Sequence, residues 1–127
     1  MRHLSRFDIV IGVAVATSLV AGSLGDLPRI LGAHPFWAQQ TGVIGGIGGA
    51  LLWLAQRRVG LSSSMQVITA IVALSLSATA AYFGKQVFAA SFAENWIAGR
   101  FWYFGWFAVS GSVAFLLAAT IAGALRR

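Results

Sequence analysis

Four long apolar stretches, uncharged through their centres, constrain the fold of this chain more than any other feature. They cover about residues 7–25, 36–56, 64–84 and 101–125, and Asp8 at the start of the first is the only charged residue among them. About 20 helical residues, at 1.5 Å rise each, span the roughly 30 Å hydrocarbon core of a bilayer. A water-soluble helix would also show a polar face. We therefore predict an all-α integral membrane protein, a single domain over residues 1–127 built as a bundle of four transmembrane helices.

The composition agrees with a lipid environment. Only 9% of the residues are charged and 58% are hydrophobic, whereas a soluble domain carries about 25% charged residues. The net charge is +6, but the basic residues lie in small groups at the ends of the apolar stretches. That placement is typical of membrane anchoring and not of nucleic-acid binding, so we expect no nucleic-acid partner. The absence of cysteine excludes disulfides, thiolate metal sites and cysteine nucleophiles.

The distribution of lysine and arginine predicts the orientation, because cytoplasmic loops carry more of both. One side of the membrane would hold six arginines and the other side three basic residues together with Asp26 and Glu94. The first group is Arg2, Arg6, Arg57, Arg58, Arg126 and Arg127, and the second is Arg29, Lys85 and Arg100. We expect both termini in the cytoplasm and a bacterial inner membrane.

Aromatic residues support the same assignment of ends, since tryptophan and tyrosine gather at membrane interfaces. The predicted outer belt is Trp37, Trp96, Trp102, Tyr103 and Trp106. Trp53 is predicted to mark the inner interface.

The segment 85–100 is predicted to be a short amphipathic helix on the outer surface. Phe88, Phe92 and Trp96 recur every four residues, with Lys85 and Glu94 off that line. The alternative is that the segment extends the third helix out of the membrane.

The N-terminus allows two interpretations. Ser5 precedes Asp8 by three residues, which indicates a capping box at the start of the first helix. The same region also has the order of a cleaved signal peptide, with the basic stretch "MRHLSRF", the apolar core "IVIGVAVATSLV" and the small residues "AGS".

The glycine cluster and the two histidines are the residues that could bind a cofactor. The stretch "GVIGGIGGALLW" lacks the lysine of a phosphate-binding loop and the third glycine of a dinucleotide-binding fingerprint. The two histidines, His3 and His34, are predicted on opposite sides of the membrane and cannot share a metal. His34 alone could ligate a pigment or haem, but its place in a loop between prolines favours a polar interfacial histidine. We expect no cofactor and no metal.

Carboxylates offer little for catalysis. Asp8 is predicted beside Arg6 on the cytoplasmic side, and no ionisable side chain lies at a helix centre, where proton-coupled transport usually needs one. A polar cluster on the outer side is conceivable, and separate surface charges are the alternative. Its members would be Asp26, Arg29, His34, Glu94 and Arg100. Since no base accompanies the hydroxyls of the third helix, we expect no enzyme.

Small residues instead indicate helix packing. On a helical wheel Gly42, Gly45, Gly46 and Gly49 share one stripe, opposite a face of branched residues. In lipid such a stripe marks the close approach of another backbone, within the chain or from another chain. The fourth helix offers a matching ridge of Ser110, Ala114, Ala118 and Ala122, and the third offers Ala73, Ser77 and Ala81.

These observations predict an accessory, structural or assembly subunit that packs against other membrane chains or associates with itself. The alternative is a small oligomeric permease or channel, in which Gln39, Gln40, Thr41 and the hydroxyls of the third helix would line a path. An intramembrane enzyme acting on lipid through Asp26, Glu94 or His34 is the third reading.

Overall fold

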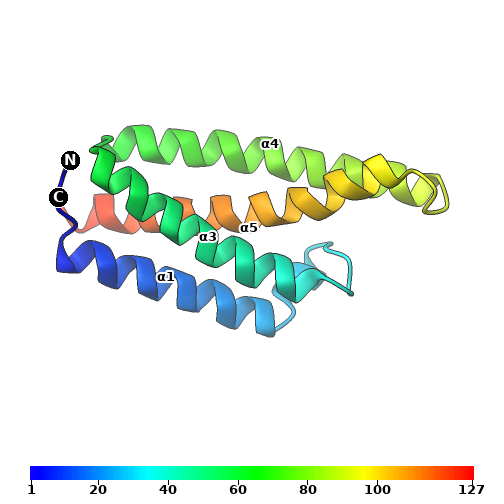
Figure 1. Ribbon diagram of the computed structural model, residues 1–127, viewed down its shortest axis with the longest axis horizontal. Coiled ribbons are helices and arrows are strands. Elements are labelled where there is room, and N and C mark those ends of the chain that lie inside the picture. Colours follow the sequence, from blue (N-terminus) through cyan, green and yellow to red (C-terminus); the bar gives the residue numbers. More distant parts are fainter.

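The computed structural model describes residues 1–127 as an all-α chain without strands. Its helices are α1 (Arg6–Leu24), α2 (Leu27–Ile30), α3 (Ala38–Val59), α4 (Ser63–Ala90) and α5 (Trp96–Ala124) (Figure 1). Three of them, α1, α4 and α5, are long and apolar enough to cross a membrane. The chain is therefore a helical membrane protein with three candidate spans. The 22-residue α3 is not among the three, since its glycines, glutamines and terminal arginines lower its hydropathy.

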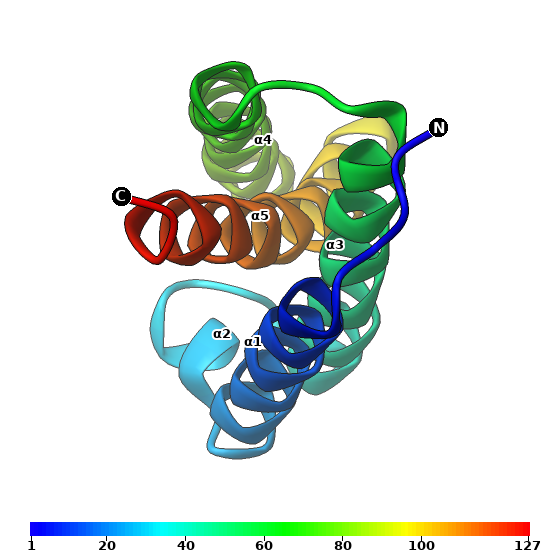
Figure 2. The ribbon, with the colours of Figure 1, turned by 90° about the vertical axis from the view of Figure 1, so that its left-hand side faces the viewer.

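The four long helices run alternately up and down, so both chain termini and the α3–α4 turn lie at one end (Figure 1). Seen from that end, α5 lies between α4 on one side and α1 with α3 on the other (Figure 2). The main helix contacts are those of α5 with α4, α3 and α1, and of α1 with α3. Residues from every other long helix therefore face α5.

Side-chain caps explain where the helices begin. The Ser5 hydroxyl accepts from the Asp8 backbone N–H, and the Asp8 carboxylate accepts from the Ser5 N–H, so the predicted capping box is present. Ser62 caps α4 and Asn95 caps α5 in the same manner, each accepting from a backbone N–H three residues later. The α3 helix ends at Gly60, whose φ of 88° suits glycine because it has no Cβ.

The predicted surface helix over residues 85–100 is wrong. The α4 helix continues to Ala90, a tight turn follows with positive φ at Phe92 (54°) and Ala93 (66°), and α5 begins at Trp96. Phe88 packs on the Trp102 ring, with centroids 5.8 Å apart, and faces α5 and not the lipid surface. The three aromatics therefore share no helix face, since Phe92 lies exposed in the turn and Trp96 begins α5. The alternative of a longer third helix described the segment better, because α4 continues to Ala90.

The centre of the bundle is built mainly from small residues of α5. Ala114, Ala118 and Ala119 are fully buried, and Phe115 and Ala122 lie beside them. Trp53 belongs to the same core with none of its surface exposed, so its prediction as an interface marker is wrong. A large aromatic side chain fits there because the alanines of α5 leave it room.

Candidate functional site

The four glycines of the α3 stripe lie against two helices of the chain itself. A Cβ at Gly45 would lie 2.6 Å from the Phe107 carbonyl oxygen and 2.8 Å from the Ser110 Cβ, and one at Gly49 would overlap the Gly111 backbone. Both glycines thus face α5. Real Cβ atoms do not approach other atoms this closely, so only glycine permits this distance between the two helices.

Gly42 and Gly46 face α1 and the first connection. A Cβ at Gly46 would lie 2.6 Å from the Leu19 Cβ, and one at Gly42 would lie 2.9 Å from the Pro28 Cγ and overlap Ser23. The wheel describes one stripe, but the structure divides it between α1 and α5. Gly42 and Gly46, four residues apart, both lie against α1 and the first connection, whereas Gly45 and Gly49 both lie against α5.

The small ridge of α5 lies inside the bundle. Ser110 is 5% exposed, and Ala114, Ala118 and Ala122 are 1% exposed or less. The third predicted helix, which is α4, also offers a ridge of small residues. In it Ser77 and Ala81 are buried, while Ala73 is exposed. The α4–α5 contact also uses two glycines outside every predicted ridge, since a Cβ at Gly84 or Gly105 would lie within 3 Å of the opposite backbone.

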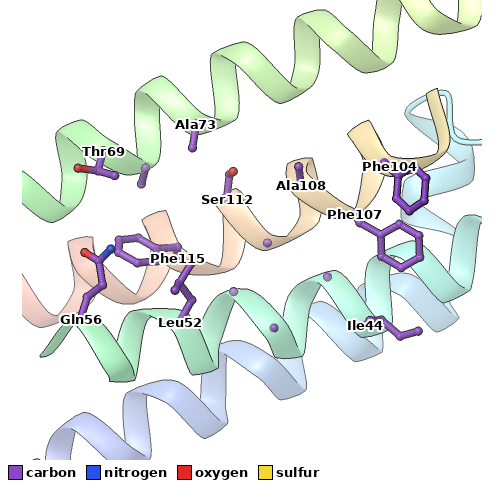
Figure 3. A pocket seen from close by; sticks show the side chains of 15 residues that line it. Ile44, Leu52, Gln56, Thr69, Ala73, Phe104, Phe107, Ala108, Ser112 and Phe115 are labelled. Atoms are coloured by element: carbon purple, nitrogen blue, oxygen red, sulfur yellow. The ribbon is translucent and has the colours of Figure 1, made fainter. Parts of the chain in front are cut away.

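A groove opens between α3 and α4, with α5 as its floor (Figure 3). Its volume is about 510 Å³, and its walls carry small residues, among them Gly48, Ala70, Ala73, Ala108 and Gly111. Side chains from α3, α4 and α5 surround it, with Phe104 and Phe107 toward one end and Gln56 and Phe115 toward the other (Figure 3). Gly48 is exposed, and a Cβ there would meet nothing within 4 Å.

The groove is apolar apart from three uncharged polar residues, Gln56, Thr69 and Ser112. The Gln56 Oε1 is buried and accepts no hydrogen bond within the chain. Ala73, Phe104 and Ala108 also line an adjoining hollow of about 640 Å³, which reaches Trp96 and Arg100. The two hollows together follow α5 from Phe115 to Trp96, at its start.

A buried ion cluster joins α1, α3 and the end of α5. Asp8 is 1% exposed, and its Oδ1 accepts from Arg57 Nε at 3.3 Å and from Arg126 Nη2 at 2.7 Å. Its Oδ2 accepts from the Ser5 hydroxyl at 2.8 Å and from the Ser5 N–H at 3.0 Å. Arg57 is 3% exposed, and its Nη2 has no acceptor. These are the only ion pairs of the chain, and together they hold three helix ends.

This cluster is not among the sequence predictions. Asp8 is predicted beside Arg6, but its partners in the structure lie 49 and 118 residues away. One signal was available, because an acidic residue and two arginine pairs share one predicted membrane side.

A second buried polar contact lies near the cluster. The Trp53 Nε1 donates to Gln66 Oε1 at 3.2 Å, and the Gln66 Nε2 donates to the Leu61 carbonyl at 3.2 Å. Gln66 is fully buried. This pair connects α3 to the first turns of α4, which follow a connection of only three residues, 60–62. It explains why a tryptophan side chain with a polar N–H can lie inside the bundle.

The five residues of the suggested outer cluster share no ion pair or hydrogen bond. Asp26 accepts from Gln39 Nε2 at 3.4 Å, and Glu94 lies exposed in the α4–α5 turn. Arg100 lies over the Trp96 ring at 4.4 Å, and Arg29 is exposed on the short helix α2. These five residues therefore lie as separate side chains and do not form a cluster.

His34 lies among aromatic rings at the same end of the bundle. Its ring stacks on Trp37 at 5.7 Å and meets the edge of Trp102 at 5.3 Å, while its Nδ1 accepts from the Phe36 N–H. Trp102 is 8% exposed and donates to the Gly32 carbonyl at 3.2 Å. Trp102 therefore ties the first connection to α5 at the end where the outer belt was predicted, with most of its ring inside the bundle.

The residues suggested for a permeation path do not converge. Gln39 and Gln40 are exposed, and Thr41 is fully buried with its hydroxyl bonded to the Ala38 carbonyl. Ser77 and Thr79 of α4 donate to carbonyls of their own helix, as helix hydroxyls commonly do.

Comparisons with protein-family models, curated proteins and solved structures find no match for this chain. A proposal for its function therefore rests on the fold and on the geometry described above.

Proposed function

We propose that this chain is a small non-enzymatic membrane subunit that packs against a transmembrane helix of another chain, in an accessory, structural or assembly role. Gly48 carries the proposal. The other four glycines of the cluster are covered by α1 or α5, whereas Gly48 lies exposed on the wall of the α3–α4 groove. Small residues on a membrane helix mark where another backbone approaches closely. An uncovered glycine on the groove wall therefore supports contact with a further helix.

The rest of the groove has the chemistry of a helix contact. Ala73 and Ala108 are exposed small residues that face the groove from α4 and α5 (Figure 3). A helix placed there would approach all three backbones closely. The buried Gln56 Oε1 would accept a hydrogen bond from a hydroxyl or amide on that helix, and such bonds add about 1–2 kcal/mol in model membrane peptides.

Affinity purification from membranes tests the proposal with matched variants. The tagged chain is extracted in mild detergent, and its bound membrane proteins are identified by mass spectrometry. Gly48→Leu and Ala73→Leu fill the groove, so we expect both to lose the bound chain. Ala55→Leu changes an exposed small residue on α3 that does not line the groove, so it should keep the bound chain.

A thermal unfolding midpoint equal to that of the unchanged protein shows that each variant is folded. Two differently tagged copies, expressed together, tell a second copy of this chain from a different protein. Equal recovery of every bound membrane protein by all three variants contradicts a role for the groove.

We further propose that all four long helices cross the membrane, with both termini in the cytoplasm of a bacterial cell. In support, α3 has 22 residues, about 33 Å of helix, and six arginines gather at the end with the termini. The chain has no cysteine, so single cysteines can report the topology. A membrane-impermeant maleimide on intact cells should label Phe36→Cys and not Leu61→Cys. Labelling of both positions contradicts a crossing by α3.

A further inference from the structure

Both chain termini lie at one end of the bundle (Figures 1 and 2), and this end is strongly basic. Six of the nine lysine and arginine residues of the chain belong to it. They are Arg2, Arg6, Arg57, Arg58, Arg126 and Arg127. The Arg2 N–H also donates a hydrogen bond of 2.9 Å to the Arg58 carbonyl, which holds the N-terminal segment at this end.

This positive charge is poorly compensated within the chain. Asp8 is the only carboxylate side chain at this end, and it is already occupied by Arg57 and Arg126. The remaining four arginines are exposed and form no ion pair. In a membrane protein such groups lie at the depth of the lipid phosphates, so they attract anionic headgroups.

A pocket of about 430 Å³ opens at this same end, between the first turns of α4 and the last turns of α5. Ser63, Ser64 and Arg127 line it at the basic end. Val67, Ile68 and Ala119 line it one or two turns further into the bundle. Its polar part therefore lies where a lipid headgroup would lie, and its apolar part follows the direction of an acyl chain.

We propose that this pocket binds one anionic phospholipid. The guanidinium of Arg127 and the hydroxyls of the two serines contact the phosphate, since arginine matches phosphate oxygens in geometry and charge. One acyl chain lies along the apolar part between α4 and α5. The positive charge of Arg127, the only charged residue that lines the pocket, favours an anionic headgroup over a zwitterionic one.

Native mass spectrometry of the full chain in detergent tests this assignment, with phosphatidylglycerol or phosphatidylcholine added. We expect phosphatidylglycerol to be retained about fivefold more than phosphatidylcholine, the effect of a single arginine near an anionic lipid. Arg127→Gln should remove that preference. Gly123→Leu should lower retention of both lipids, because a Cβ there fits at 3.8 Å from the Ser63 Cβ and the longer side chain enters the pocket.

Arg100→Gln is the matched control, since Arg100 lies far from this end, in the first turns of α5, and outside the pocket. It should leave the preference unchanged. Inorganic phosphate at millimolar concentration should not displace the lipid, because it lacks the acyl contact. Equal retention of the two lipids overturns the proposal. Equal losses from Arg127→Gln and Arg100→Gln, or full displacement by phosphate, also overturn it. Thermal midpoints close to that of the unchanged protein show that the variants are folded.

Discussion

Replacing Asp8 by asparagine should lower the free energy of unfolding by about 3 kcal/mol. The change leaves Arg57 buried at 3% exposure without a counter-charge. Breaking a buried ion pair from one side costs about 3–5 kcal/mol, since the remaining charge stays desolvated. We expect the lower end because Arg57 makes a single contact, through Nε at 3.3 Å.

The other interactions of Asp8 add little to this magnitude. The Arg126 side chain is 34% exposed, so it can turn to solvent in the variant, and such exposed pairs contribute about 0–1 kcal/mol. Asparagine keeps an oxygen that can accept from the Ser5 N–H and thus preserves part of the capping box.

Unfolding in mixed micelles of increasing SDS content, followed by far-UV circular dichroism, measures this difference. Asp26→Asn is the control, because Asp26 only accepts from Gln39 at 3.4 Å on the surface, and it should change the stability by less than about 1 kcal/mol. The double variant Asp8→Asn/Arg57→Met should recover most of the loss, because an apolar residue needs no counter-charge. Equal effects of the two single variants would refute the reasoning.

Four further variants test the packing of the bundle. Gly49→Ala should destabilise the protein by about 1–3 kcal/mol, because its Cβ would overlap the Gly111 backbone, whereas Gly48→Ala should be neutral or stabilising; SDS unfolding compares them. Trp53→Phe should cost about 1–3 kcal/mol in the same assay because it leaves the buried Gln66 Oε1 without its donor, and an unchanged midpoint would contradict that bond. Trp102→Phe removes the bond to the Gly32 carbonyl, so amide exchange in residues 27–37 should become faster, while unchanged exchange would argue against this tie.

The sequence alone determined the helical membrane class, because that class depends on local properties. A run of about 20 uncharged apolar residues can satisfy its backbone in lipid only as a helix. The capping box at Ser5 could be predicted for the same reason, since its two residues lie three positions apart. The prediction of a surface helix over residues 85–100 was wrong, because aromatic periodicity does not distinguish a helix on the lipid surface from one packed on a neighbouring helix.

Only the tertiary structure decided which surfaces meet. The glycine stripe of α3 was visible in the sequence, but its division between α1 and α5, with Gly48 exposed, depends on how three helices are arranged in space. The burial of Asp8 between Arg57 and Arg126 likewise joins residues 49 and 118 positions apart. Periodicity describes one helix at a time, whereas partner choice follows from the close packing of several helices, which determines how deeply each residue is buried.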